Sequence, residues 1–418
     1  MRIRNNLKIY LDYASATPIN EKVFKLMSSY EKDFFANPTS IHNSGVRVRN
    51  IIEKSRSIIA KEINAHSDEI IFTGSSTESN ALAIIGIINN YKLQEGNKNI
   101  IPHIITTEIE HPAVLMNCRL LEESGAAEVT YIKVNEKGIV NPKDIKDSIK
   151  KNTVLISVMY ANNEIGTVQP IKEIAKIIRY YKKETLDFSV RHSTSFSLYP
   201  FFHTDATQAM NYLDTSNIEK LGVDMLSFNG SKIYGPKSIG VLYKKRSVLL
   251  SQIYGGGNQE FGLRSGTENV SLIAGIALAL FITNKIKNKE VERLTNLRDY
   301  LIKKIFEIKV PPFKIILNGD SKERLPNNIN ISIVGISSEL LVIELDAKGI
   351  ELSSKSACKS GEDNDSYVIK AIRQASHEEL KEEEGSLRIT LGRETNRIEI
   401  NSFISALIKI LDKYKNWK

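Results

Sequence analysis

The pattern of apolar and polar positions changes once along the chain, near residue 267. Between about residues 44 and 245, short β-rich runs alternate with segments whose apolar residues recur at helical spacing. This alternation predicts a largely parallel sheet with helices on both faces. The expected strands are 69–74, 103–108, 128–134, 153–160, 201–206, 224–228 and 239–243, and the expected helices are 46–63, 77–90, 112–124 and 171–181.

The C-terminal part of the chain has a different pattern. Two helices, 269–286 and 290–308, are expected before a set of short apolar runs, and a last helix is expected at 396–414. This order predicts a smaller α+β domain. Two segments without a period, the polar 182–200 and the acidic 375–386, are expected to be loops.

Composition narrows the class of protein. The 418 residues are 41% hydrophobic and 25% charged, which is typical of a globular protein. No apolar run approaches the roughly 20 residues of a membrane span, and the N-terminus lacks the long uncharged run of a signal peptide. We therefore expect a cytoplasmic protein that has no membrane partner.

The net charge of +8 has two explanations. A basic surface could meet tRNA or an acidic protein. Lysines spread over solvated helix faces give the same charge, and no basic run is interleaved with aromatic residues as a base-stacking surface would be. Direct binding of nucleic acid is therefore not expected.

The two cysteines, Cys118 and Cys358, lie far apart and share no metal-ligand spacing. A structural zinc site or a disulfide framework is therefore not expected. Cys118 lies in an amphipathic helical pattern and is expected to be an inert core thiol.

Candidate chemistry follows several of the expected strands, where parallel sheets place their ligands. Asp205 ends one strand, and Lys232 lies 27 positions later in a Gly-rich loop. A lysine amine can form a Schiff base with the aldehyde of pyridoxal phosphate, and an aspartate can keep the pyridine nitrogen protonated. A surface lysine and a capping aspartate would give the same pattern.

A possible phosphate site lies at residues 74–77, between a strand and a helix. Small residues and the free N–H groups of a helix N-terminus suit an anion, although a plain Ser/Thr N-cap has the same sequence. His111, at another strand end, could stack on a flat ring. Asn162, Asn163 and Glu164 follow a further strand and could bind a ring hydroxyl or a substrate carboxylate.

Taken together, these motifs resemble the cysteine desulfurases, which belong to the class V aminotransferase group of fold-type I pyridoxal phosphate enzymes. The matching stretches occur in order between about residues 9 and 412: YLDYASATP, FTGSSTESN, EHPAVL, NNEIGTVQP, HTDATQ, GSKIYGPKSIGVLY, YGGGNQEFGLRSGTEN, SSKSACKSG and LRITLGR. The resemblance implies an α/β large domain over residues 15–265 with a mostly parallel seven-stranded sheet. It also implies a small α+β domain made of residues 1–14 and 266–418, which carries the cysteine loop.

The resemblance implies a role for each matching residue. Lys232 would form the Schiff base, Asp205 would pair with the pyridine nitrogen and Gln208 with the ring hydroxyl. His111 would stack on the ring, and Thr267 would reach the phosphate of a neighbouring subunit, which implies a homodimer. The residues implied to surround the phosphate are Ser76, Thr77, Asn229 and Ser231. Asn163 and Arg388 would bind the substrate carboxylate, because a guanidinium fork suits that task.

Cys358 would be the nucleophile that separates desulfurases from ordinary aminotransferases. It lies in SSKSACKSGEDND between Lys355 and Lys359, and nearby positive charge raises the thiolate fraction of a thiol. The resemblance implies that L-cysteine becomes L-alanine while its sulfur passes to Cys358 as a persulfide. The setting is similar to the subgroup that supplies sulfur-acceptor proteins in iron–sulfur cluster assembly and tRNA thiolation.

The chain departs from the family pattern at three places. Asn229-Gly230-Ser231 stands where Ser-x-His is usual, and Lys355 stands where glycine is common. The segment 183–199 has the character of an insertion. Alternative functions are a selenocysteine lyase, another class V aminotransferase, or a binding protein whose catalytic site has decayed.

Overall fold

The computed structural model describes residues 8–192, 199–354, 366–376 and 384–416. Its centre is a seven-stranded sheet in the order β2-β8-β7-β6-β5-β3-β4. Strand β8 runs antiparallel to both of its neighbours, and the other four pairings are parallel. The strands are β2 (Ile70–Thr73), β3 (His103–Thr107), β4 (Glu128–Ile132), β5 (Thr153–Ser157), β6 (Phe201–Asp205), β7 (Met225–Asn229) and β8 (Gly240–Lys244). The predicted mostly parallel sheet is confirmed.

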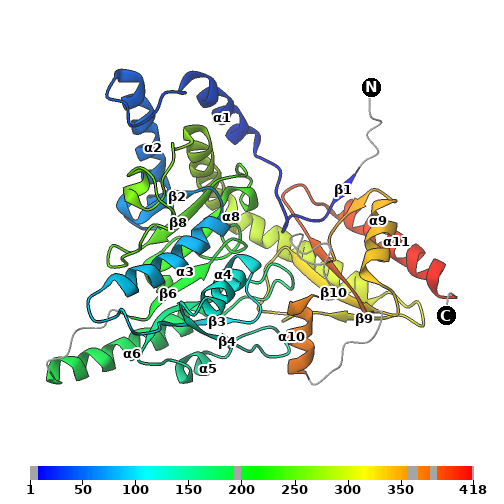
Figure 1. Cartoon of the computed structure of the whole chain (residues 1–418). Coiled ribbons are helices and arrows are strands. Elements are labelled where there is room, and N and C mark those ends of the chain that lie inside the picture. Colours follow the sequence, from blue (N-terminus) through cyan, green and yellow to red (C-terminus); the bar gives the residue numbers. More distant parts are fainter. Residues whose placement is uncertain (1–7, 193–198, 355–365, 377–383, 417–418) are drawn as a thin grey trace.

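Helices cover both faces of this sheet because successive strand residues point to opposite sides. On β3, Ile104 packs with α3 (Ser76–Leu93) and α4 (Pro112–Glu123), while Ile105 packs into the core on the other face. That second core is built with α2, α6 and the first half of α8, and Figure 1 shows the sheet between these layers. The remaining helices of this region are α1 (Glu21–Asp33), α2 (Asn43–Glu62), α5 (Pro142–Asp147), α6 (Ile171–His192) and α7 (Ile218–Leu221).

A smaller unit follows along the chain, on the right in Figure 1. Its antiparallel sheet has the order β12-β10-β9, and β1 pairs in parallel with β11 beside it. A separate hydrophobic core fills this unit and includes Leu11, Ile331 and Phe403. Its elements are β1 (Ile9–Tyr10), β9 (Lys314–Leu317), β10 (Asn328–Val334), α9 (Ser338–Asp346), β11 (Ile350–Glu351), α10 (Tyr367–Ala375), β12 (Glu384–Thr390) and α11 (Arg397–Tyr414).

The two helices predicted at 269–286 and 290–308 are wrong as separate elements. They form one helix, α8 (Val270–Phe306), whose first half packs on the large sheet and whose second half packs in the small unit. The polar middle of α8 stays helical because tertiary hydrogen bonds stabilise it. Asn284 donates to the Glu62 carbonyl, and Lys287 donates to the Leu213 carbonyl. The helix is long and apolar enough to cross a membrane, but 61% of its apolar window is buried inside the protein, as expected of a core helix.

The prediction that a loop begins at residue 182 is also wrong. Helix α6 continues to His192, and Lys182 in this helix pairs with Asp224 at 3.3 Å. The run of Lys, Glu and Leu after residue 181 has good helix propensity, which outweighed the apparent loss of period. The part of the loop at residues 193–198 lies outside the described residues, as does most of the acidic segment 375–386.

Two buried histidines link neighbouring strands of the large sheet. His203 on β6 makes hydrogen bonds of 2.8 Å to Ser157 on β5 and 2.9 Å to Ser227 on β7. His103 on β3 makes bonds of 2.8 Å to both Thr153 and Thr130. Burial lowers the pKa of both imidazoles, that of His103 to about 4. Both rings are therefore neutral at pH 7.

The neutral His203 makes stability depend on pH. Below its ordinary pKa of about 6.5 the unfolded chain takes up a proton that the folded protein does not, so stability is lost as pH falls toward the folded pKa. As the pH falls below 6.5, we expect the free energy of unfolding of His203→Gln to decrease less than that of the wild type, by about 1.4 kcal/mol per pH unit. Urea unfolding at pH 7 and pH 5 measures it.

The exposed Asn89, whose side chain does not titrate, provides the control for this experiment. Asn89→Ala should leave the pH dependence of the wild type unchanged. The same pH dependence in the wild type and in His203→Gln would contradict the account.

Candidate active site

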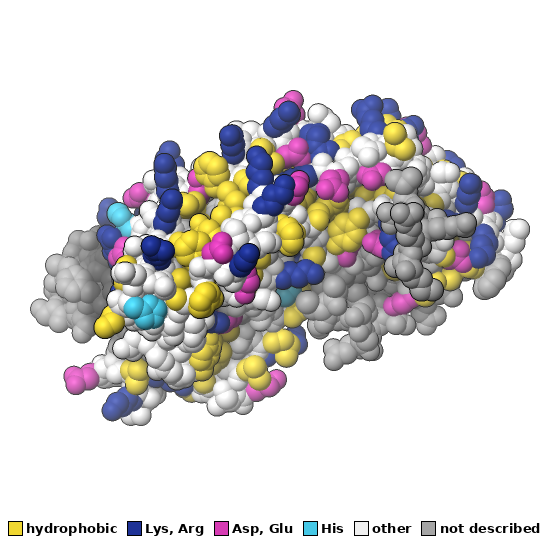
Figure 2. Space-filling view, turned by 90° about the horizontal axis from the view of Figure 1, so that it is seen from above, with side chains coloured by type: hydrophobic (Ala, Val, Ile, Leu, Met, Phe, Trp, Pro, Cys, Tyr) yellow, Lys and Arg dark blue, Asp and Glu magenta, His cyan; other side chains and the backbone are white. Residues whose placement is uncertain are grey.

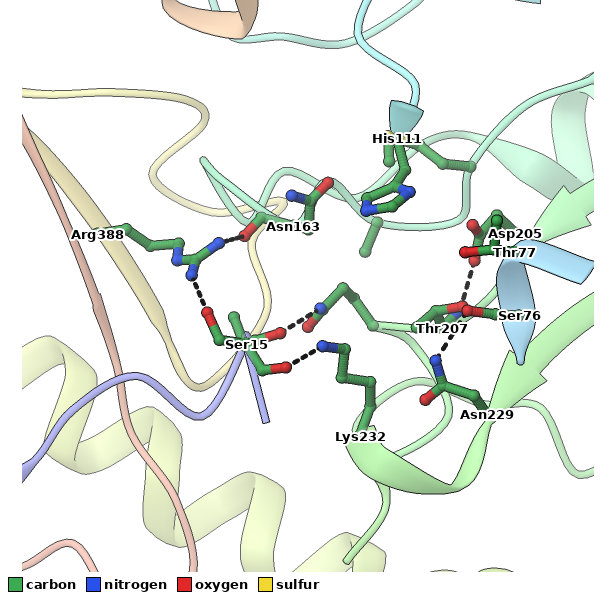
Figure 3. A pocket seen from close by; sticks show the side chains of 14 residues that line it. Ser15, Ser76, Thr77, His111, Asn163, Asp205, Thr207, Asn229, Lys232 and Arg388 are labelled. Atoms are coloured by element: carbon green, nitrogen blue, oxygen red, sulfur yellow. Dashed lines mark hydrogen bonds between the residues drawn. The ribbon is translucent and has the colours of Figure 1, made fainter. Parts of the chain in front are cut away.

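Residues from distant parts of the chain meet where the parallel strands end. Asp205 closes β6, Asn229 closes β7, and His111 and Asn163 follow β3 and β5. They line a cavity of about 190 Å³. Its lining consists of Ala14, Ser15, Ser76, Thr77, His111, Met159, Ala161, Asn163, Asp205, Thr207, Gln208, Asn229, Lys232 and Arg388, and Figure 3 shows how the polar ones face one another.

The Asp205 carboxylate is held from two sides. Asn80 on α3 donates its side-chain N–H to Oδ2 at 2.7 Å, and the backbone N–H of Thr207 donates to Oδ1 at 2.9 Å. Asp205 is 6% exposed and Asn80 is fully buried. The carboxylate is therefore fixed in orientation at the cavity wall.

The N-terminus of α3 forms another wall of the cavity. Ser76 and Thr77 are its first residues, after the N-cap Ser75, and Asn229 donates to the Ser76 hydroxyl at 2.8 Å. Ser231 in turn donates to Asn229 at 3.1 Å. Free N–H groups, hydroxyls and the positive end of the helix dipole make this wall suitable for an anion.

Lys232 enters the cavity from a short turn that follows β7. Its ammonium group donates to the backbone carbonyl of Ser15, and the side chain of Asn211 holds the Lys232 carbonyl. Figure 3 shows Lys232 directed toward the N-terminal segment at Ser15. The amine therefore lies inside the cavity, beside the N-terminal segment.

His111 is both the N-cap of α4 and a wall of the cavity. Its Nδ1 accepts the backbone N–H of Ala113 at 3.1 Å, so in the neutral ring the proton is assigned to Nε2. Burial lowers the pKa of His111, and the positive charges of Lys232 and Arg388 lower it further, while Asp205 acts in the opposite sense. The ring is therefore neutral at pH 7.

Arg388, on β12 of the small unit, reaches the same cavity and is 2% exposed. Its Nη2 donates to Asp12 at 2.8 Å and to the Ser15 hydroxyl at 2.6 Å, and its Nη1 donates to the Asn163 carbonyl at 3.2 Å. Both units of the fold therefore contribute to one site.

The cavity collects most of the predicted site residues, but not all. Ser231 and Thr267 are not among its lining residues, Thr267 is exposed, and Cys358 lies outside the described residues. The prediction for Cys118 is confirmed, since it is fully buried on α4 and burial raises its pKa to about 12.

Four residues of the site were not predicted from the sequence, namely Asp12, Ser15, Asn80 and Thr207. The motif that contains Asp12 and Ser15 was recognised, but their partner Arg388 is more than 370 positions away. Thr207 could have been found, because an Asp followed two residues later by a small polar residue is typical of an Asx turn.

The residues fit the cofactor that the sequence implies. Three buried polar atoms at the cavity make no hydrogen bond within the described parts of the chain: Thr207 Oγ1, Asn163 Oδ1 and Arg388 Nε. Buried polar atoms of this kind are uncommon, and at the wall of a cavity they can bond to a ligand or to water. An anion-binding helix end, a fixed carboxylate and an amine match a phosphate, a basic ring nitrogen and an aldehyde.

Comparisons with known proteins agree with this geometry. The Aminotransferase class-V family matches residues 9–190 and 197–403. A cysteine desulfurase IscS of Dictyoglomus turgidum is 40% identical, covering 98% of this chain and 95% of its own, and IscS 1 of Archaeoglobus fulgidus is 37% identical, covering 97% and 98%. A solved structure of a NifS-like protein superposes with a TM-score of 0.83 at 28% identity, covering 97% of this chain and all of its own.

These matches define first a class of protein, the class V aminotransferases of fold-type I, which are pyridoxal phosphate enzymes. Within that class, the chain belongs to the cysteine desulfurase family. The predicted family, fold class and cofactor are thereby confirmed.

The contact between Asn80 and Asp205 gives a test of the site. Asn80→Ala removes one hydrogen bond to a buried carboxylate, so we expect the affinity for pyridoxal phosphate to fall about tenfold. Equilibrium dialysis of the cofactor measures this. Asn89→Ala, at an exposed position of the same helix, is the control and should leave the affinity unchanged. Equal affinity in both variants would contradict the role of Asn80.

Proposed function

We propose that this cysteine desulfurase converts L-cysteine to L-alanine at the cavity around Lys232 and hands the sulfur to Cys358. The observation that carries the proposal is the meeting of Lys232, Asp205 and Arg388 at one cavity. An amine, a fixed carboxylate and a guanidinium are the three groups needed to bind the cofactor and an α-amino acid beside it.

The cofactor would be held at both ends. Lys232 would bond the aldehyde, Asp205 would keep the ring nitrogen protonated, and His111 would pack its neutral ring on the pyridine. The Gln208 side-chain N–H donates to the Ala14 carbonyl at 2.9 Å, and a Gln208 N–H would donate to the ring hydroxyl when the cofactor is bound. The phosphate would be bound by Ser76, Thr77 and Asn229, and Ser231 would support this group through its hydrogen bond to Asn229. When bound, pyridoxal phosphate supplies an electron sink for charge that develops at the substrate Cα.

The substrate carboxylate would bind between Asn163 and Arg388. Both side chains line the cavity, and Arg388 Nε is unpaired within the described residues. Once the substrate is bound, the Lys232 Nζ would act as the base that removes the proton from the substrate Cα.

Cys358 is the proposed sulfur acceptor. The net change is L-cysteine plus a protein thiol giving L-alanine plus a protein persulfide, in which an S–S bond forms and a C–S bond breaks. The transferred sulfur is oxidised to the persulfide level, its two electrons reduce the substrate Cβ, and the alanine methyl group gains one of the two thiol protons.

The flanks of the Cys358 segment support its access to the cavity. The Ser353 carbonyl accepts the backbone N–H of Arg388 at 2.7 Å. On the other side, Ser366 donates to Glu164 and the Tyr367 hydroxyl donates to the carbonyl of Glu110, which precedes His111. Cys358 follows Ser354 by four residues (358 minus 354), and such a length of chain spans up to about 14 Å.

We further propose a homodimer in which Thr267 contributes to the neighbour's phosphate site. Thr267 is exposed and does not line the cavity of its own chain. Large hydrophobic side chains are exposed on α1 and the segment after it, with Phe35 at 87% and Ile41 at 94%. Figure 2 views the molecule from the side of α1 and α2 and shows hydrophobic side chains among Lys and Arg. Apolar surface of this kind favours a protein partner.

The division into a large domain, 15–265, and a small domain, 1–14 plus 266–418, is also proposed. The separate core around Leu11, Ile331 and Phe403 supports it, while α8 belongs to both cores.

The partner protein that takes the sulfur from Cys358 is proposed to belong to iron–sulfur cluster assembly or to tRNA thiolation in the cytoplasm. The similarity to proteins called IscS supports the first of these roles.

Cys358→Ser tests the sulfur transfer. We expect the variant to keep the visible absorbance of the bound cofactor and to lose all sulfide release from L-cysteine in the presence of dithiothreitol, because an alcohol does not accept the sulfur. Cys118→Ala is the matched control and should retain the wild-type rate. Normal sulfide release from Cys358→Ser would exclude the role.

Mixed dimers test the position of Thr267. Lys232→Ala and Thr267→Ala chains are each expected to be nearly inactive alone. In a mixed dimer, the site that keeps Lys232 receives Thr267 from the other chain, so mixing the unfolded chains and refolding them should restore sulfide release. If Thr267 serves its own chain's cavity, no activity will return.

A further inference from the structure

We propose that Asp12 and Ser15 are positioning residues for Arg388, and that they make the site select amines that carry a carboxylate. This inference rests on the proposed role of Arg388 in binding the substrate carboxylate. It assigns a function to the N-terminal segment, residues 9–17, which crosses from the small unit to the loop that carries Lys232.

The segment is fixed along its whole length. At its start β1 pairs with β11, and Ala14 N–H donates to the Thr390 hydroxyl at 3.0 Å. At its end the Thr17 hydroxyl donates to the Ser231 carbonyl at 2.9 Å. Between these anchors Asp12 and Ser15 face Arg388 (Figure 3 shows the Ser15 contact). The segment therefore has little freedom to move independently of the site.

Asp12 supplies the counter-charge that a buried guanidinium needs. Arg388 is 2% exposed, and a charge at such a depth is stable only when it is paired and hydrogen-bonded. The Asp12 side chain, 17% exposed, accepts from Nη2 at 2.8 Å. With the Ser15 bond at 2.6 Å, both N–H groups of Nη2 are used.

This arrangement decides which donors remain for a substrate. Nη1 gives one N–H to the Asn163 carbonyl, so among the described residues its second N–H and the unpaired Nε–H are left. The Ser15 hydroxyl accepts from Arg388, so its own proton is free to turn toward an oxygen atom in the cavity. A substrate carboxylate would therefore bind to N–H groups of a guanidinium that Asp12 holds in place, and not to a mobile guanidinium.

Ser15 also connects the two ends of an α-amino acid. Its hydroxyl contacts Arg388, which would bind the carboxylate, and its carbonyl accepts from Lys232, which lies at the amine end. The separation of amine and carboxylate in an α-amino acid is fixed by covalent geometry. A residue that contacts both protein groups sets the corresponding separation in the site.

The test compares two ligands of the holoenzyme. L-alanine carries a carboxylate and ethylamine does not, and both are titrated by the change in visible absorbance of the bound cofactor. Asp12→Asn and Ser15→Ala should each raise the dissociation constant of L-alanine about tenfold and leave that of ethylamine unchanged. Circular dichroism at 222 nm checks that each variant is folded.

Glu351→Gln is the control beside this segment, because Glu351 on β11 pairs with Lys8 next to β1 and makes no contact with Arg388 among the described residues. It should bind both ligands as the wild type does. Equal weakening of L-alanine and ethylamine in Asp12→Asn, or unchanged binding of L-alanine in both variants, overturns the proposal.

Arg388→Ala separates this inference from the proposed function. If Arg388→Ala loses L-alanine selectively while Asp12→Asn and Ser15→Ala do not, only the positioning role is wrong. If Arg388→Ala binds both ligands like the wild type, the carboxylate role of Arg388 fails, and the inference fails with it.

Discussion

The site depends on one constraint of the fold, namely that parallel strands end at the same edge of a sheet. Strands β3, β5, β6 and β7 run in the same direction, so the residues that follow them meet without any long loop. This edge brings His111, Asn163, Asp205 and Lys232 to one cavity. The antiparallel β8 beside β7 also matters, because it fixes the turn from which Lys232 projects.

A second constraint is that the cavity is closed by the small unit. Arg388 comes from β12, and it is neutralised by Asp12 of the N-terminal segment rather than by a residue of the large sheet. Helix α8 spans both hydrophobic cores and therefore couples the two units. The relative positions of Lys232 and Arg388 thus follow from packing between distant parts of the chain, and not from one local motif.

Much of this arrangement could be predicted from the sequence, because a residue at the end of a strand can be recognised from the short apolar run that precedes it. Asp205, Lys232 and His111 each follow a short apolar run, and the Gly-Ser-Ser-Thr turn predicts a helix N-terminus that is suitable for an anion. The contacts of Asn80, Asp12 and Ser15 could not be predicted, since their partners lie 125 to 376 positions away. The continuity of α8 was missed for another reason, because its polar middle is stabilised by tertiary contacts that a periodic pattern does not contain.

The most direct test of the account is to identify the amine that carries the cofactor. Reduction of the active holoenzyme with sodium borohydride, followed by proteolysis and mass spectrometry, locates the covalently fixed pyridoxyl group. The account predicts the label on the peptide that contains Lys232, and no label in Lys232→Ala. A label on another lysine of the active enzyme, or an active enzyme that takes no label, would contradict it.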